Sequence, residues 1–257
     1  MSWYGDYAFW APRVPVATKI ARGRAAAKKL AASEGRKPEP IAVQGRKIAK
    51  TFWGVKWCEN LERYRDLSNR LPRGATYVRN GSVADLVIEP ARVRAVVGGT
   101  EAYTVKIDIQ TLKRGVWEAI CRECAQAVDS LFDLLQGRFN DNVMQRLTQA
   151  DGGLFPHKTE ISMTCSCPDS ASVCKHIAAA FYGVAARLDQ RPDLLFKLRN
   201  VDHLELIAHA TDAANLDQAL SSSGESLSDA DLGDIFGIEL ESTDISSAVP
   251  GKRTPKQ

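Results

Sequence analysis

The chain has 257 residues, of which 44% are hydrophobic and 25% are charged, and its formal net charge is +3. This composition is that of an ordinary globular protein of one or two domains. There is no uninterrupted apolar run of about eighteen residues, so we expect no membrane span, and the N-terminus lacks the basic and apolar regions of a secretory signal.

The small net charge conceals an uneven distribution along the chain. Residues 1–75 contain sixteen Lys or Arg against six Asp or Glu, residues 76–200 fifteen against fourteen, and residues 201–257 three against eleven. Such asymmetry often marks a basic surface for nucleic acid and an acidic tail. The alternatives are that the two ends pair with each other or are simply solvated.

The first 45 residues are interpreted as a basic arm that also contains aromatic side chains. Residues 17–34 are rich in Ala and Lys and favour a helix, but its apolar face is thin and Gly23 weakens it, so we expect a mobile arm that orders on binding. The aromatic residues between positions 3 and 10 would stack on bases or anchor the arm to the folded domain. The basic side chains that would contact nucleic acid are Arg13, Lys19, Arg22, Arg24, Lys28, Lys29, Arg36, Lys37, Arg46, Lys47 and Lys50.

Residues 46–150 are expected to form a domain of helices and an antiparallel sheet. Apolar residues at helical spacing from Trp53 to Leu71 predict an amphipathic helix that ends at residues 71–74 and buries its tryptophans. Residues 113–136 carry the apolar stripe of a second, long helix, followed by another up to residue 147. Four runs rich in Val and Ile, separated by short turns, predict an antiparallel meander: residues 75–78, 82–89, 92–98 and 103–109.

Cys121 and Cys124 lie on the apolar stripe of the long predicted helix. A C-x-x-C pair is either a redox motif or half of a zinc site, and Cys58 with His157 would complete a second ligand set. A redox pair normally lies at a helix N-terminus, where the thiol pKa is lowered. We therefore interpret these cysteines as small core residues, and we expect the remaining histidines to have no special role.

Residues 164–184 are the most informative segment of the chain. Cys165, Cys167, Cys174 and His176 follow the pattern C-x-C, six residues, C-x-H. Three thiols and one imidazole complete a tetrahedral ligand set for Zn²⁺ and leave no position for a substrate. Side chains two apart share one face of a strand, so the first two cysteines can approach one ion from a strand end. The last two ligands are expected just before a helix and in its first turn, because residues two apart on a helix do not face each other.

These spacings predict a unit of strand, turn, strand and helix around one metal ion, within residues 151–200. A helix N-terminus stabilises the negative charge of the thiolates. Metal is expected to be essential, because a unit of some forty residues has a marginal core without it. A closed site indicates a binding or adaptor protein rather than a zinc hydrolase, and its free thiols suit the reducing cytoplasm.

This segment resembles a SWIM zinc finger in all four ligands and in the helix that follows them. The wider chain is similar to bacterial SWIM zinc finger proteins that work beside Swi/Snf-type helicases, through residues 45–64, 69–83 and 231–240 in addition to the finger. The resemblance thus extends over roughly residues 45–240. It implies zinc binding with contacts to DNA or protein, and it implies no catalytic activity.

After the finger, residues 201–240 are expected to form an acidic helical extension, and residues 241–257 a disordered tail. The chain has no G-x-S-x-G, Walker-type or H-E-x-x-H motif, so we expect no enzyme.

The predicted fold is α+β, with an antiparallel meander packed with amphipathic helices, then a small ββα zinc finger and a short helical C-terminal region. The favoured function is a zinc-binding accessory protein that binds nucleic acid, with DNA the expected partner. The alternative is a zinc-stabilised adaptor for a Swi/Snf-type helicase.

Overall fold

The computed structural model describes residues 13–62, 70–124, 141–149 and 151–210. The chain divides into two compact units, residues 1–212 and 213–257, and all described residues belong to the first. The predicted aromatic cluster at positions 3–10, the second half of the helix predicted over residues 113–136, and the extension beyond residue 210 lie outside them. In the described part of the chain, no helix is both long and apolar enough to cross a membrane.

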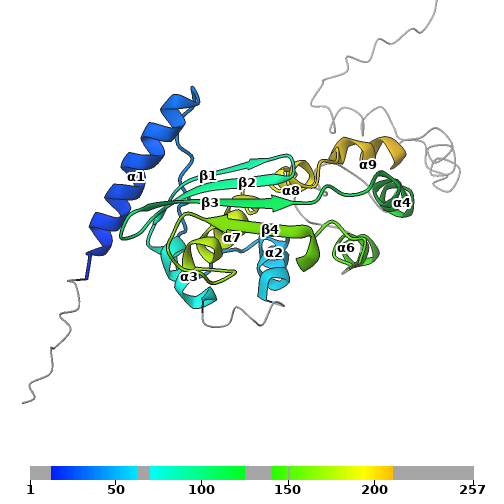
Figure 1. Cartoon of the computed structure of the whole chain (residues 1–257). Helices are drawn as coiled ribbons and strands as arrows, with labels where there is room; N and C mark the ends of the chain where they lie inside the picture. Colours follow the sequence, from blue (N-terminus) through cyan, green and yellow to red (C-terminus); the bar gives the residue numbers. More distant parts are fainter. Residues whose placement is uncertain (1–12, 63–69, 125–140, 150, 211–257) are drawn as a thin grey trace, which may run out of the picture. The chain divides into compact units, whose positions relative to one another are not determined.

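A four-stranded antiparallel sheet in the order β1-β2-β3-β4 forms the centre of the fold (Figure 1). Its first three strands are joined by short turns and form the predicted meander. The fourth strand comes from the predicted zinc-finger segment and pairs with β3, with Val105 opposite Cys165 and Ile109 opposite Ile161. Together with the helices, this sheet confirms the α+β class. The strands are β1 (Val83–Glu89), β2 (Arg92–Gly98), β3 (Ala102–Ile109) and β4 (Ile161–Cys165).

The predicted zinc-finger segment therefore does not form a ββα unit of its own. It contributes one strand, β4, and one helix, α7 (Lys175–Leu188), while residues 166–174 between them are irregular. All residues of α7 except Lys175 and Arg187 are buried. A helix that is buried on nearly all sides lies in a core, so this segment shares the sheet and the main core with the rest of the unit.

Helices pack with α7 on one face of the sheet. They are α2 (Phe52–Glu62), α3 (Leu71–Arg79) and α8 (Asp193–Leu198). Trp53 and Trp57 of α2 are 1% and 2% exposed, as predicted for core tryptophans, and the indole N–H of Trp57 donates to the Phe181 carbonyl at 3.0 Å. The main core lies between these helices and the side chains that point to this face of the sheet.

Helix α3 corrects two predictions, the strand at residues 75–78 and the helix end at residues 71–74. Pro72 occupies the first turn of α3, where its missing N–H costs nothing. Gly74 lies against α7, where an added Cβ would be 2.5 Å from the Cβ of Ala178. The proline and glycine that we interpreted as a helix end thus begin a helix and allow it to cross α7 closely.

Helix α1 (Val16–Ser33) covers the other face of the sheet. Its buried Ala27 packs against Ala84 and Val96, whose side chains point away from the main core. A Cβ added at Gly23 would lie 2.9 Å from the Cα of Gly98. The helix that we expected in a mobile arm is therefore packed on the sheet. Gly23 allows α1 to approach β2 closely, rather than weakening the helix.

Short elements complete the described unit. They are α4 (Arg114–Cys124), α6 (Asp141–Leu147), the 3-10 helix η2 (Lys158–Glu160) and α9 (His203–Ala210). Arg199, which is 1% exposed, donates to the Gln110 carbonyl at 2.7 Å and to Glu160 at 3.1 Å. These bonds tie the end of α8 to the segments that follow β3 and precede β4.

Candidate metal centre

The structure brings the four predicted ligands together at the junction of β4 and α7. Cys165 is the last residue of β4, Cys167 follows in the irregular segment, Cys174 is the N-cap of α7 and His176 lies in its first turn. Their ligand atoms all lie within 4.8 Å of one another. Cys174 and His176 are buried, and the other two cysteines are partly buried.

The distances in this cluster suit a tetrahedral metal ion. The Nδ1 atom of His176 lies 3.8 Å from the sulfur of Cys165 and 3.8 Å from that of Cys174. Around zinc, metal–ligand bonds of about 2.0–2.3 Å place sulfur and nitrogen about 3.6 Å apart. The Cys3His cluster is thus able to hold a metal ion through Nδ1 of the histidine.

The pKa shifts of the thiols also favour metal binding. A hydrogen bond from the Cys165 thiol, followed by bonds from His176 and the backbone N–H of Ile177, lowers the pKa of the Cys174 thiol. The hydrogen bond with Cys174, together with burial, raises the pKa of Cys165. Cys174 lies at the N-terminus of α7, where the helix dipole also favours a negatively charged thiolate. A bound cation would release the remaining protons.

Two tyrosines hold the imidazole in place. The ring of Tyr103 stacks on His176 with the ring centroids 4.3 Å apart, and Tyr77 meets it edge-on at 5.5 Å. The Nε2 atom of His176 is buried and has no hydrogen-bond partner among the described residues. A side chain at Gly99 would come within 3.1 Å of Nε2. No sequence pattern pointed to these three neighbours, because they come from α3, from the β2–β3 turn and from the beginning of β3.

The irregular segment that carries Cys167 is held at two positions, Ser166 and Asp169. The guanidinium of Arg70 pairs with Asp169, which also accepts the backbone N–H of Ala171 at 3.2 Å. Ser166 donates its backbone N–H to the Thr104 carbonyl at 3.0 Å, and its hydroxyl accepts the N–H of Thr104 at 3.0 Å. These bonds fix the segment to the N-cap of α3 and to β3, so they position the cysteines without a metal ion.

The other cysteines show the properties of core residues. Cys121 and Cys124 are buried in α4, and burial raises the pKa of Cys121 to about 12 and that of Cys124 to about 11. Burial likewise raises the pKa of Cys58 to about 12. Within the described ranges, the single group of Cys, His, Asp or Glu residues placed to hold a metal is the Cys3His cluster. The second ligand set with His157 is not formed.

The eleven basic candidates do not share one surface. Five of them, Lys19, Arg22, Arg24, Lys28 and Lys29, lie on α1, and exposed Arg13 precedes it. The last three precede α2, on the side of the sheet where α3 and α7 pack: Arg46, Lys47 and Lys50. The Arg46 carbonyl accepts a bond from Arg79 of α3, and the Lys50 backbone N–H donates to Asp189 after α7. The sheet therefore separates two basic groups.

Arg36 has a structural role instead. It donates to the buried carboxylate of Asp85 at 2.6 and 3.0 Å and pairs with Glu34 at 2.7 Å. Lys37, beside it, is exposed. In the described part of the chain, the five basic residues of α1 form no ion pair, whereas Arg36 and Arg94 share the carboxylates around them.

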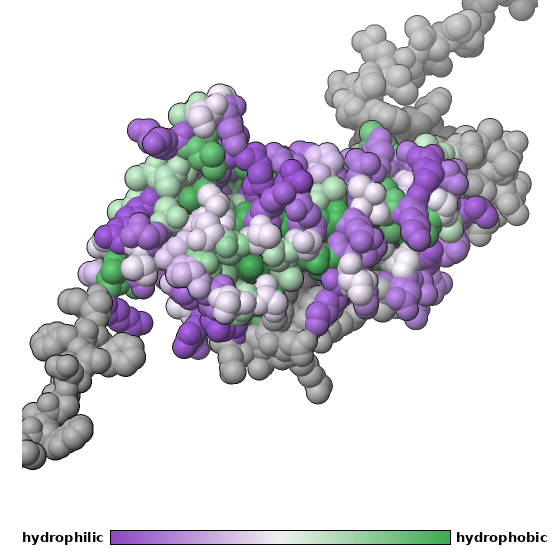
Figure 2. Space-filling model, viewed as in Figure 1, coloured by the Kyte–Doolittle hydropathy of each residue, from purple (hydrophilic) through white to green (hydrophobic). Residues whose placement is uncertain are grey.

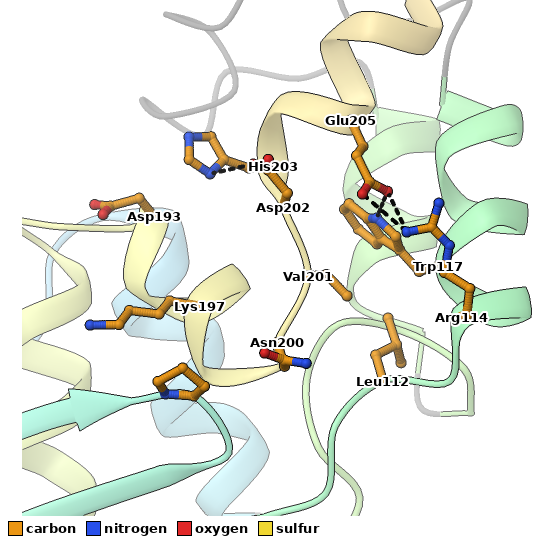
Figure 3. Close-up of a pocket in the computed structure, with 11 residues that line it drawn as sticks. Leu112, Arg114, Trp117, Asp193, Lys197, Asn200, Val201, Asp202, His203 and Glu205 are labelled. Atoms are coloured by element: carbon orange, nitrogen blue, oxygen red, sulfur yellow. Dashed lines mark hydrogen bonds and ion pairs between the residues drawn. The ribbon is translucent and has the colours of Figure 1, made fainter.

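A hollow of about 710 Å³ lies among α4, α8 and α9 (Figure 3). Several of its polar side chains are engaged with each other. Arg114 pairs with Glu205 at 3.0 Å, the Trp117 indole donates to the same carboxylate at 2.8 Å, and His203 lies 3.8 Å from Asp202. We assign this hollow no ligand.

The described unit is an α+β fold with a Cys3His cluster that could hold a metal ion. An uncharacterized protein of Mycobacterium tuberculosis, Rv2102, is 34% identical to the chain over 175 residues, which cover 67% of the chain and 62% of that protein. The chain therefore spans less than two thirds of the length of this relative. No protein-family model and no solved structure matches the chain.

Proposed function

We propose that the Cys3His cluster binds Zn²⁺ and serves as a structural site. The observation that carries this proposal is the convergence of three sulfurs and one imidazole nitrogen within 4.8 Å at the junction of β4 and α7. Thiolate-rich tetrahedral sets select zinc among common cations. Four protein ligands leave no open position, so the ion would stabilise the fold and perform no chemistry.

We further propose that the chain is a SWIM-type protein without enzymatic activity. The C-x-C and C-x-H spacing supports this assignment. In the structure, zinc would connect the end of β4 to the beginning of α7, two elements that are otherwise joined by nine irregular residues, 166–174.

We propose nucleic-acid binding as the function that the zinc site supports. The support is α1, which carries five basic residues, no acidic residue and no ion pair to a described carboxylate. The adaptor alternative gains less support, because the large hydrophobic side chains exposed in the described residues are Val16 and Leu204 alone, and an apolar docking surface normally gathers several.

The zinc proposal is tested by metal content per chain, measured by mass spectrometry on wild type, Cys174→Ser and the matched control Cys124→Ser. We expect one zinc in the wild type and the control, and a loss of metal in Cys174→Ser. Unchanged zinc in Cys174→Ser would show that the ligand set is wrong. The nucleic-acid proposal is tested by fluorescence anisotropy with DNA and RNA across a salt series. No salt-dependent binding to any nucleic acid at low ionic strength would exclude it.

A further inference from the structure

We propose that the nucleic acid is duplex DNA, with α1 in its major groove and one sugar-phosphate backbone against the open face of β3 and β4. This inference rests on the nucleic-acid binding proposed above and names its ligand and its surface. Three features carry it: the charge of α1, a cleft beside α1, and the kind of side chains that line the cleft.

The charge of α1 is not balanced by its surroundings. Three carboxylates on this side of the sheet are engaged with other partners: Glu34 pairs with Arg36 and Arg94, Glu89 with Arg94, and Asp108 with Lys106 and Arg92. Exposed Glu101, in the β2–β3 turn beside α1, offsets one of the five positive charges of the helix. The sheet face beneath the helix is therefore close to neutral. The net positive charge of this side of the molecule comes from α1, which is the charge complement of a phosphate backbone.

The basic residues of α1 form two edges with small side chains between them. At 100° per residue, Arg22 and Lys29 lie along one edge, and Arg24 and Lys28 along the other. Exposed alanines, among them Ala25, lie between the edges. Figure 2 shows hydrophilic side chains on α1 separated by paler and green ones. A helix with a narrow, small-residue outer face and cations at both edges suits a groove whose two walls are phosphates.

A cleft of about 530 Å³ lies between α1 and the uncovered part of the sheet. Leu30 of α1 forms one wall, and the floor includes exposed residues of β3 and β4 and of the segment after β4. The exposed floor residues are polar, namely Thr104, Lys106, Thr164 and Ser166, whereas Ala95, Val96 and Val105 give the cleft an apolar part as well. Hydroxyl and ammonium groups of this kind are common donors to phosphate oxygens. Thr164 and Ser166 flank Cys165, so a metal ion bound at Cys165 would fix the position of this side of the cleft.

The lining favours a duplex over a single strand. The described residues that line the cleft include no aromatic side chain, whereas proteins that bind single strands stack bases on aromatic rings. The major groove of B-DNA is about 12 Å wide and admits an α-helix, while that of duplex RNA is too narrow. The outer face of α1 has few side chains that read base edges, so we expect weak sequence preference.

The test uses the full chain with metal bound and measures anisotropy of a labelled DNA duplex, its single strand and an RNA duplex of the same sequence. The test variant is Arg24→Gln/Lys28→Gln/Lys29→Gln, since Gln keeps helix propensity. The matched control removes three charges from the other side of the sheet: Arg46→Gln/Lys47→Gln/Lys50→Gln. A third variant, Thr104→Val/Thr164→Val, removes hydroxyls from the cleft and keeps strand-forming side chains.

We expect the α1 variant to bind duplex DNA about tenfold more weakly at low salt, with the salt slope reduced by about 0.9 for each phosphate that the variant no longer neutralises. The cleft variant should lose affinity severalfold, and the control should lose less than either. Equal binding of the α1 variant and the control, or single strands bound as tightly as the duplex, would overturn the inference while nucleic-acid binding itself stands. No binding to any of the three probes would instead remove the proposed function.

Discussion

Gly74→Ala tests the close packing of α3 against α7. A Cβ at Gly74 would lie 2.5 Å from the Cβ of Ala178 and 2.7 Å from the carbonyl carbon of the same residue. Carbon atoms in contact prefer about 3.5–4.0 Å, so the two helices must separate by roughly 1 Å. Such overpacking costs about 1–3 kcal/mol, while replacing a helical glycine gains about 1 kcal/mol. We expect a net loss of up to about 2 kcal/mol in the free energy of unfolding, whereas the same substitution at an open helical position gains stability.

The matched control is Gly115→Ala in α4, where a Cβ would meet nothing within 4 Å. It should leave stability unchanged or raise it by up to about 1 kcal/mol. Both variants are compared with wild type by urea unfolding of the metal-bound protein, followed by tryptophan fluorescence. Because Ala178 lies two residues after His176, the metal content of each variant is measured as well. If Gly74→Ala is as stable as Gly115→Ala, the close crossing of α3 and α7 is wrong.

The remaining predictions concern three buried or paired groups. Asp85→Asn should cost about 1.5–3 kcal/mol, because Arg36 loses a charged acceptor, and an unchanged urea midpoint would contradict this. Hydrogen bonds from Arg94 and Arg36 lower the pKa of Glu34 from 4.5 to about 2, so its stabilisation is present above pH 4.5 and is lost as the pH falls towards 2. The urea midpoints of wild type and Glu34→Gln should therefore converge over that range, and a constant gap would refute the pairing. Cys121, with its pKa raised to about 12, should resist maleimide at neutral pH in the native chain, and rapid labelling would contradict its burial.

The Cys3His cluster was predictable from sequence because it depends on local spacing. C-x-C at a strand end and C-x-H at a helix start each place two ligands close together, and a short segment joins the two pairs. The structure brings all four within reach of one ion. The neighbours of His176 were not predictable, since Tyr77 and Tyr103 are distant from it along the chain and meet it only through non-local packing.

The meander was predictable because alternating apolar residues and short turns act locally. The pairing of β4 with β3 was not, because it joins segments more than fifty residues apart and nothing in either strand specifies its partner. The strand predicted at residues 75–78 failed for a related reason: Val and Tyr in a short run suit a strand, but packing against α7 decides in favour of a helix. The roles of Gly23 and Gly74 were not predictable, because a glycine in a helix has the same sequence signature whether it weakens the helix or permits a close approach.

Basic residues that are close together along the chain do not form one surface in the structure. Residues 13–50 contain eleven basic side chains, and their proximity suggested one surface. The chain instead crosses from one face of the sheet to the other after α1, where the Ile41 N–H donates to the Val83 carbonyl of edge strand β1. Lys29 and Lys47 thus lie on different sides, and Arg36 is paired with Asp85.

X-ray absorption at the zinc edge on the purified wild-type chain tests the central claim most directly. The account predicts one zinc per chain, bound by three sulfurs at about 2.3 Å and one nitrogen at about 2.0 Å. A chain purified without metal that also fails to take up added zinc, or sulfurs joined to each other in a disulfide, would contradict it.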